Sequence, residues 1–193
     1  MRSLYFDDFY NSAYNEKDIS ILDRQKFRIR TYNHSTDVIH LERKIKHNNY
    51  TYKQIAPLSI KEVLQIMLGE YAFLRESAQP LHNIFYHQII SNVFRPRVIV
   101  DYEREPFIFS PGSVRITFDS NIRMGLDQTN LFNPLLSMAE TLPAQFLIME
   151  VKYTAFLPRF IRQLLPTQAA EYSAISKYIL ACEGTFYRRQ TDH

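Results

Sequence analysis

The sequence has few of the residues on which the common disulfide, nucleotide and metal motifs depend. Its single cysteine, Cys182, excludes an internal disulfide and a multi-cysteine metal site. Its four glycines lie too far apart to form a GxGxxG or Walker loop, so side chains would have to hold any bound phosphates. The six histidines form no HExxH motif. His82 and His87 lie five residues apart on an expected helix, where they diverge, and both are interpreted as structural.

Long apolar runs are also missing. No stretch approaches the roughly 20 residues that a membrane-spanning helix needs. The first residues, MRSLYFDDFYN, carry aspartates where a signal peptide needs its apolar region. Apolar residues make up 46% of the 193-residue chain and charged residues 22%, which is typical of a globular protein and argues against disorder. We therefore expect a cytoplasmic protein that forms a single domain over residues 1–193.

The chain is moderately basic, with a formal net charge of +3 and an isoelectric point near 8.9. This balance permits a polyanionic partner without requiring one. The charges alternate with apolar residues inside strand-like segments and do not gather in a tail. The pattern therefore favours a shaped site over nonspecific binding to nucleic acid.

Alternation of side chains with a period of two predicts most of the chain's secondary structure to be strands. An Asn-Asn turn at 47–49 is expected to join two of them into a hairpin. The expected strands are residues 3–7, 26–33, 37–47, 48–55, 95–109, 113–123 and 144–156.

Helices are predicted between and after the strands. Ser59 and Glu62 form an S-x-x-E capping box, and helical spacing of apolar residues then continues to Leu74. Gly184 is expected to cap the last helix. The further expected helical segments are a turn within 15–22, a helix from Pro80 to about residue 94, one from Pro158 to Pro166, and one over about 168–183; residues 124–142 are expected to be a loop. This order, without regular βαβ alternation, indicates an α+β fold with an antiparallel sheet.

Each predicted strand has a charged face and an apolar face. Arg28 and Arg30 oppose Phe27 and Ile29, while Glu150 and Lys152 share one face. If helices pack on the apolar faces, the charged faces turn toward each other and the sheet curls into a barrel with a charged interior. The alternative is an open sheet with helices on one face and water on the other. The number of arginines, which suit bidentate phosphate binding, and the carboxylates beside lysines favour the barrel.

The charged segments resemble, in order, motifs of the VTC-type polyphosphate polymerase domain, the catalytic domain of the vacuolar transporter chaperone complex. That domain is one of the triphosphate tunnel metalloenzymes, in the CYTH-like superfamily. The similar segments are SLYFDD, RIRTYN, LERKIK followed by Lys53, DYERE, VRITFD, MEVKY and SKY. Any one segment is weakly specific, because R-x-R and E-x-K are common, but seven in family order span nearly the whole chain.

The resemblance implies an antiparallel tunnel barrel, surrounded by helices, that binds linear polyphosphate along its axis. The residues that it implies are catalytic Arg28, Arg30, Arg104, Arg115 and Lys152, phosphate-binding Lys44, Lys53, Tyr102, Ser176 and Lys177, and the metal ligand Glu150 with Glu42 as a second. Ordinary packing of Tyr102 and an exposed helical position for Lys177 remain as alternatives for those two residues.

The activity that the resemblance implies is transfer of the γ-phosphate of ATP to a growing inorganic polyphosphate chain, with Mn²⁺ or Mg²⁺ as cofactor. Two alternatives stay open: an inorganic triphosphatase or nucleoside triphosphatase of the same fold, and a noncatalytic polyphosphate-binding module. The expected partners are ATP and inorganic polyphosphate or triphosphate. Nucleic acid is not expected, because a narrow tunnel excludes a duplex and basic residues are not interleaved with aromatic ones.

The resemblance is incomplete at the start of the chain. Family members carry a further strand ahead of SLYFD, with acidic and basic residues that face the tunnel, whereas this sequence begins at Met1. We therefore expect that first strand to be missing and phosphate and metal binding to be weaker. The resemblance also leaves open the oligomeric state and a membrane-protein partner that would receive the polymer at the inner face of a membrane.

Overall fold

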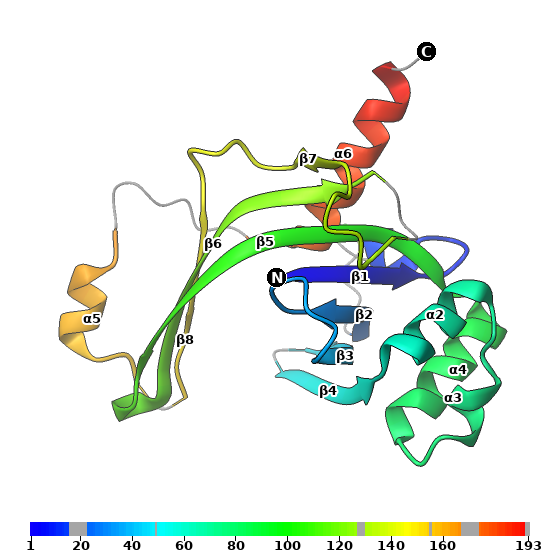
Figure 1. Cartoon of the computed structure of the whole chain (residues 1–193). Coiled ribbons are helices and arrows are strands. Elements are labelled where there is room, and N and C mark those ends of the chain that lie inside the picture. Colours follow the sequence, from blue (N-terminus) through cyan, green and yellow to red (C-terminus); the bar gives the residue numbers. More distant parts are fainter. Residues whose placement is uncertain (16–22, 49, 127–129, 155, 167–173, 192–193) are drawn as a thin grey trace.

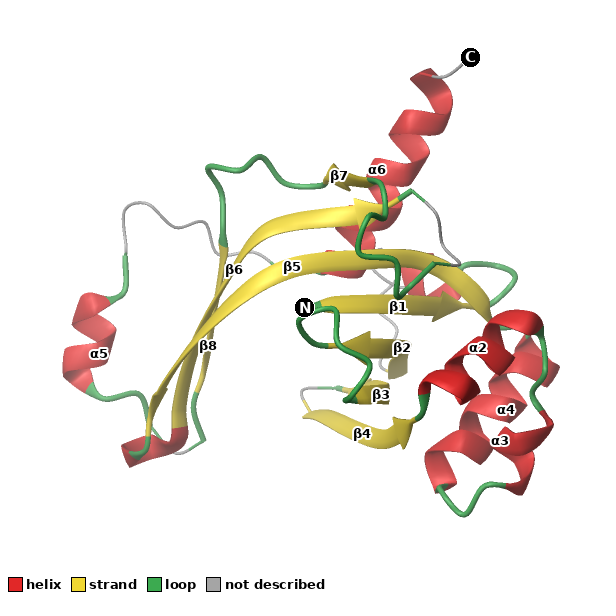
Figure 2. Cartoon of the chain, viewed as in Figure 1, coloured by secondary structure: helices red, strands yellow, loops and turns green. Residues whose placement is uncertain are grey.

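The computed structural model describes residues 1–15, 23–48, 50–126, 130–154, 156–166 and 174–191. Within these residues an eight-stranded antiparallel sheet carries helices on both faces, which confirms the expected α+β class (Figures 1 and 2). The strands are β1 (Arg2–Asp7), β2 (Asp23–Thr31), β3 (Ile39–His47), β4 (Tyr50–Leu58), β5 (Arg95–Phe109), β6 (Val114–Gly125), β7 (Met138–Glu140) and β8 (Ile148–Lys152). The helices are α1 (Ser12–Asn15), α2 (Ile60–Leu68), α3 (Ala72–Glu76), α4 (Pro80–Asn92), α5 (Arg159–Leu164) and α6 (Lys177–Thr191), with a 3₁₀ turn at Pro111–Ser113.

The strands lie in the order β4-β3-β2-β1-β5-β6-β7, and β8 also pairs with β6. The N-terminal strand β1 is therefore central. On one side of it, the three strands β2, β3 and β4 pair antiparallel in an unbroken register from Asp23 to Leu58. β7 and β8 pair with successive parts of β6, at Arg123–Gly125 and at Arg115–Asp119.

Two hydrophobic cores cover opposite faces of the sheet. On one face, Leu4, Phe27 and Leu41 are fully buried beneath the α2–α4 cluster, where Phe85 of α4 stacks on Phe27. On the other face, α1 and α6 pack over Tyr5, Val100 and Ile122. Because both faces are covered, every residue of β1 is buried.

The segment around α2 confirms one prediction and corrects another. The Ser59–Glu62 capping box is present, with the Ser59 amide donating to the Glu62 carboxylate at 2.7 Å. The helix does not continue to Leu74, however, because Gly69 adopts a left-handed conformation (φ 86°) that ends α2 and starts a turn into α3. Glycine takes this conformation without a steric penalty from a side chain.

The C-terminal half contains two further corrections. The predicted loop 124–142 contains β7, a three-residue strand too short to show alternation. The last helix, α6, begins at Lys177 and continues through Gly184 to Thr191, so Gly184 is a helical position and not a cap. A β-carbon at Gly184 would lie 2.9 Å from the Met124 sulfur, and this close approach to β6 explains the glycine. The residues 16–22 and 167–173, which contain parts of the predicted helical segments, lie outside the described residues.

The sheet is strongly bent, and β5 and β6 arch away from the α2–α4 side of the molecule toward α5 (Figure 1). Register shifts next to Phe6 and between Asp101 and Glu103 accompany the bend, as β-bulges do. Among the described residues, β4 and β8 are not hydrogen-bonded to each other. The sheet is thus open among the described residues, but it carries helices on both faces and not on one face only, as the open-sheet alternative required. Closure of the wall into a tunnel stays a prediction.

No helix in the described parts of the chain has the length and apolarity that crossing a membrane requires.

Candidate functional site

The strand register places the predicted site residues on one face of the sheet, which we call the basic face. Residues directly opposite each other in an antiparallel pair point to the same face. Arg28 lies opposite both Tyr5 and Glu42, and Lys44 lies opposite Lys53. The basic face carries Arg28, Arg30, Glu42, Lys44, Lys53, Tyr102, Arg104, Arg115, Glu150 and Lys152, with Ser176 and Lys177 at the start of α6.

Glu42 on β3 is the centre of the first charge cluster on this face. It is 1% exposed. One carboxylate oxygen lies 2.6 Å from Arg28 and 3.5 Å from Arg30, and the other lies 2.5 Å from Lys53 Nζ. Burial opposes the Glu42 charge, but Arg28 and Arg30, together with hydrogen bonds from Lys53 and Arg28, lower the pKa of the carboxyl to about 2. Three cations surround one anion, which leaves the cluster with excess positive charge.

Hydroxyl groups hold the two arginines of this cluster. Arg28 donates to the Tyr5 hydroxyl at 2.8 Å, and Arg30 donates to Ser3 at 3.1 Å and to Tyr102 at 3.1 Å. Arg30 is 4% exposed, whereas the side chains of Arg28 and Lys53 reach solvent. Arg28 and Lys53 are therefore placed to meet a ligand directly, and Arg30 supports them from behind.

Asp119 on β6 is the centre of a second cluster. Arg104 forms a bidentate pair with it through two 2.6 Å hydrogen bonds, and Lys177 of α6 contacts it at 2.6 Å. Both cations also lie over the ring of the buried Tyr102, at 5.3 Å and 5.0 Å from its centroid. Burial opposes the Asp119 charge, yet hydrogen bonds from Arg104 and Lys177 lower the pKa of the carboxyl. The ion pairs of this cluster therefore fix the first turn of α6 against the basic face.

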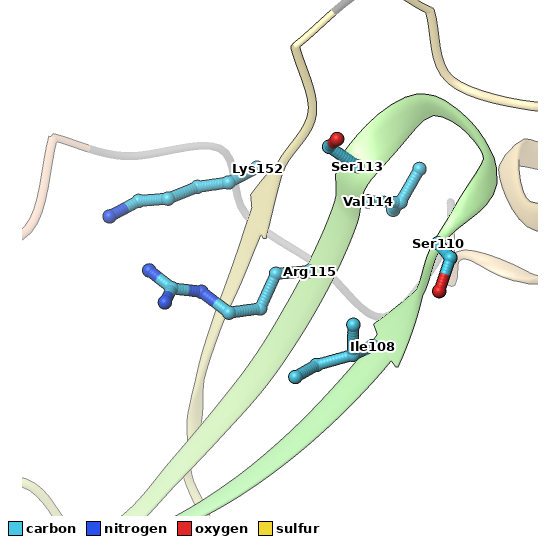
Figure 3. A pocket seen from close by; sticks show the side chains of 6 residues that line it. All are labelled: Ile108, Ser110, Ser113, Val114, Arg115 and Lys152. Carbon is cyan, nitrogen blue, oxygen red and sulfur yellow. The ribbon is translucent and has the colours of Figure 1, made fainter.

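The third group lies on β6 and β8. Arg115 is directly opposite Lys152, and the two side chains point the same way from neighbouring strands (Figure 3). They line a pocket of about 440 Å³ together with Ile108, Ser110, Ser113 and Val114. This pocket lies at the β5–β6 turn, beyond the Glu42 cluster. Lys152 and Glu150 contact each other at 3.1 Å and are about half exposed.

Electrostatic coupling connects the two ends of the sheet. Burial lowers the pKa of Lys44 on β3, and the charge of Lys152 on β8 lowers it further, whereas Glu150 raises it. In the sheet, β2, β1, β5 and β6 separate β3 from β8. The sheet is therefore curled enough for the charge of Lys152 on β8 to act on Lys44 on β3.

Several functional candidates were not predicted from the sequence. Asp119 lies within the VRITFD segment and shares a strand face with Arg115, so alternation could have identified it. Tyr5 could have been found in the same way, two residues beyond Ser3. The 3.1 Å contact from Lys26 to Ser176 joins residues 150 positions apart and has no local signal in the sequence.

The two predicted metal ligands differ in their surroundings. Both oxygens of Glu42 face cations, so the carboxylate is suited to holding Arg28 and Lys53 and not a further positive ion. Glu150 is more open and lies near basic residues that would bring phosphates beside it. Magnesium ions are commonly held by one or two carboxylates plus substrate phosphates, and Glu150 fits that arrangement. In the described ranges no group of three or more His, Cys, Asp or Glu side chains gathers as a metal site.

Comparison with known proteins gives a match to one family. A family model described as the VTC domain matches residues 1–186, which is nearly the whole chain. None of the curated proteins matches the chain significantly.

Proposed function

The chain belongs to the VTC domain family, which indicates a polyphosphate-related function, and we propose that it transfers the γ-phosphate of ATP to a growing inorganic polyphosphate chain on its basic face. The observation that carries this proposal is the convergence of cations from β2, β3, β4, β5, β6, β8 and α6 on one curled face with few carboxylates. A linear polyanion is the ligand that such an elongated cationic surface fits best.

Binding of the growing chain is assigned to the two ion-pair clusters. Arg28, Lys53, Arg104 and Lys177 each have a side chain that is held by a carboxylate and still reaches solvent. Arginine can bind phosphate oxygens with two parallel hydrogen bonds, whereas lysine acts as a point charge. Ser176 would add a hydroxyl next to Lys177, and Arg30 and Tyr102 would keep the phosphate-binding side chains in place.

The transfer step is assigned to the end of the face formed by β6 and β8. A terminal oxygen of the polyphosphate chain attacks the γ-phosphorus of ATP, the bond from that phosphorus to the bridging oxygen breaks, and ADP leaves. Arg115 and Lys152 point together into the same space, with Lys44 within electrostatic reach, and would neutralise the moving phosphoryl group. Mn²⁺ or Mg²⁺, held by Glu150 and phosphate oxygens, would supply further neutralisation of the leaving diphosphate. This chemistry needs positioning and charge, not a nucleophilic side chain.

The direct test is incubation of the purified protein with ATP and MnCl₂, followed by gel analysis of polyphosphate and measurement of ADP. We expect long polyphosphate chains, with one ADP released for each phosphate transferred. Arg28→Ala should reduce the yield of polyphosphate at least tenfold. Arg43→Ala is the matched control. Arg43 lies on the neighbouring strand β3 but points to the opposite face of the sheet, where it donates hydrogen bonds to Gln25 and Gln54. Release of orthophosphate without polyphosphate chains would contradict the polymerase proposal and indicate a triphosphatase.

A noncatalytic polyphosphate-binding module is the second candidate. It is favoured by the lack, in the described part of the chain, of a cluster of three metal-ligating side chains. This candidate predicts tight, salt-sensitive polyphosphate binding that persists in Glu150→Ala, with no turnover of ATP in either protein. Loss of all polyphosphate binding would exclude both candidates.

A further inference from the structure

Thr117 on β6 has a buried hydroxyl for which the described residues provide no hydrogen-bond partner. The residue is 2% exposed, and its Oγ1 atom is hidden from solvent. Buried hydroxyls are normally paired, because an unpaired one has lost its water without gaining a replacement. An unpaired buried group of this kind calls for an explanation, and one explanation is a bound state that supplies the partner.

The strand register places one candidate partner beside Thr117. Thr117 lies directly opposite Glu150 in the β6–β8 pair, one step along from the Arg115–Lys152 pair. Side chains at directly opposite positions have β-carbons about 5 Å apart and share a face. If the Glu150 side chain rotated away from Lys152, its carboxylate would therefore come within reach of the Thr117 hydroxyl.

Glu150 is turned the other way in the structure, toward Lys152. Both side chains of that ion pair are about half exposed, so the contact is weak and easily exchanged. A phosphate bound by Arg115 and Lys152, which line the same pocket, would compete with Glu150 for the Lys152 ammonium group (Figure 3). Binding of a phosphate to Lys152 would thus free the Glu150 carboxylate to reorient.

We propose that Thr117 is a positioning residue: its hydroxyl donates a hydrogen bond to Glu150 once a bound phosphate has taken over Lys152, and this bond orients the carboxylate toward a divalent ion shared with the phosphate. The inference rests on the proposed function, because it requires a phosphate ligand on the basic face. It explains why a threonine hydroxyl is buried without a partner beside an ion pair that is itself loosely held.

The test compares Thr117→Val, which removes the hydroxyl and keeps the shape, with Thr117→Ser, which keeps the hydroxyl. Binding of Mn²⁺ to the protein is measured by equilibrium dialysis against one Mn²⁺–tripolyphosphate solution, so that the metal chelated by tripolyphosphate alone is the same on both sides. We expect Thr117→Val to weaken Mn²⁺ binding by roughly 10-fold to 100-fold, as loss of a bond to a metal ligand commonly does. Thr117→Ser should restore most of the affinity. In a Glu150→Gln background, Thr117→Val should have no further effect.

Two controls separate this role from a structural one and from failure of the proposed function. The thermal midpoint of Thr117→Val without ligands should equal or exceed that of the wild type, since no native hydrogen bond is lost; a clear fall in both Thr117 variants would overturn the inference. Unchanged Mn²⁺ affinity in Thr117→Val would also overturn the inference. In that case, binding of tripolyphosphate by the wild type would still support the proposed function. A wild-type protein that binds neither tripolyphosphate nor Mn²⁺ with it would overturn both.

Discussion

Glu42 is the residue that allows cations to accumulate on the basic face. Its buried carboxylate compensates Arg28, Arg30 and Lys53 together, so the positive side chains can be fixed before any phosphate arrives. The sequence motif suggested a metal ligand at this position, but the surrounding cations favour an anchoring role. Fixed cations lose little conformational freedom when they bind a phosphate, which improves affinity.

Stability at acidic pH tests the anchoring role of Glu42. The folded pKa of about 2 lies below the ordinary value of 4.5, so the stabilisation is present above pH 4.5 and is lost as the pH falls from 4.5 toward 2. At one pKa unit per 1.36 kcal/mol, Glu42→Gln should lower the free energy of unfolding at pH 7 by about 3 kcal/mol. Urea unfolding of both proteins should show this difference shrinking below pH 4.5, whereas Glu105→Gln, at an exposed position, should change little. A difference that stays constant down to pH 3 would contradict the ion-pair account.

His82 is expected to make stability pH-dependent near neutrality. It is buried, with Nδ1 2.8 Å from the Ser77 hydroxyl and Nε2 3.1 Å from the Pro57 carbonyl oxygen, and burial lowers the pKa of its ring. The unfolded chain therefore binds a proton more readily, and stability should fall as the pH drops below about 6.5. The free energy of unfolding of wild type relative to His82→Gln should decline between pH 7.5 and 5.5. His87→Gln, at an exposed position of the same helix, is the matched control.

At the scale of elements, the sequence predicted strands better than helix ends. Strands β2 and β3 carry alternating patterns, because successive residues face a hydrophobic core and the charged face in turn. β7 was missed, since three residues paired to β6 carry no periodic signal. The end of α6 was misplaced because glycine ends many helices, and only the packing of Gly184 against Met124 shows its other role.

The break between α2 and α3 gives a prediction at this scale. Gly69 has a φ of 86°, and a β-carbon there would meet no atom within 4 Å, so any cost of substitution comes from the backbone conformation. Gly69→Ala should therefore lower the free energy of unfolding by about 1 kcal/mol, and Gly69→Asn by less, because asparagine tolerates the left-handed region. Chemical denaturation of the three proteins measures both changes. Equal losses for alanine and asparagine would mean that the conformation is not the cause.

At the scale of the whole molecule, the curl of the sheet determines whether the separate clusters act as one site. The order of the basic residues along the chain could be recognised from sequence motifs, and the register then placed them on one face. The distance from β3 to β8 across that face could not be predicted, because it depends on bulges and twist accumulated over several strands. The pKa of Lys44 depends on this curvature, because it responds to the charge of Lys152 on β8.

Proton uptake on ligand binding tests the curvature directly. Because burial and the charge of Lys152 lower the pKa of Lys44, the free protein gives up the Lys44 proton more readily than an ordinary lysine does, whereas a bound phosphate favours the charged form. Titration calorimetry with tripolyphosphate in two buffers of different ionisation enthalpy should show greater proton uptake for wild type than for Lys44→Met. Lys152→Met should also reduce the uptake, although four strands lie between these residues, because removing the Lys152 charge raises the pKa of Lys44 in the free protein. Lys61→Met, on α2, serves as the control and should leave uptake unchanged. If Lys152→Met behaves like this control, the two outer parts of the sheet do not face each other, and a single polyphosphate chain would not be held by both.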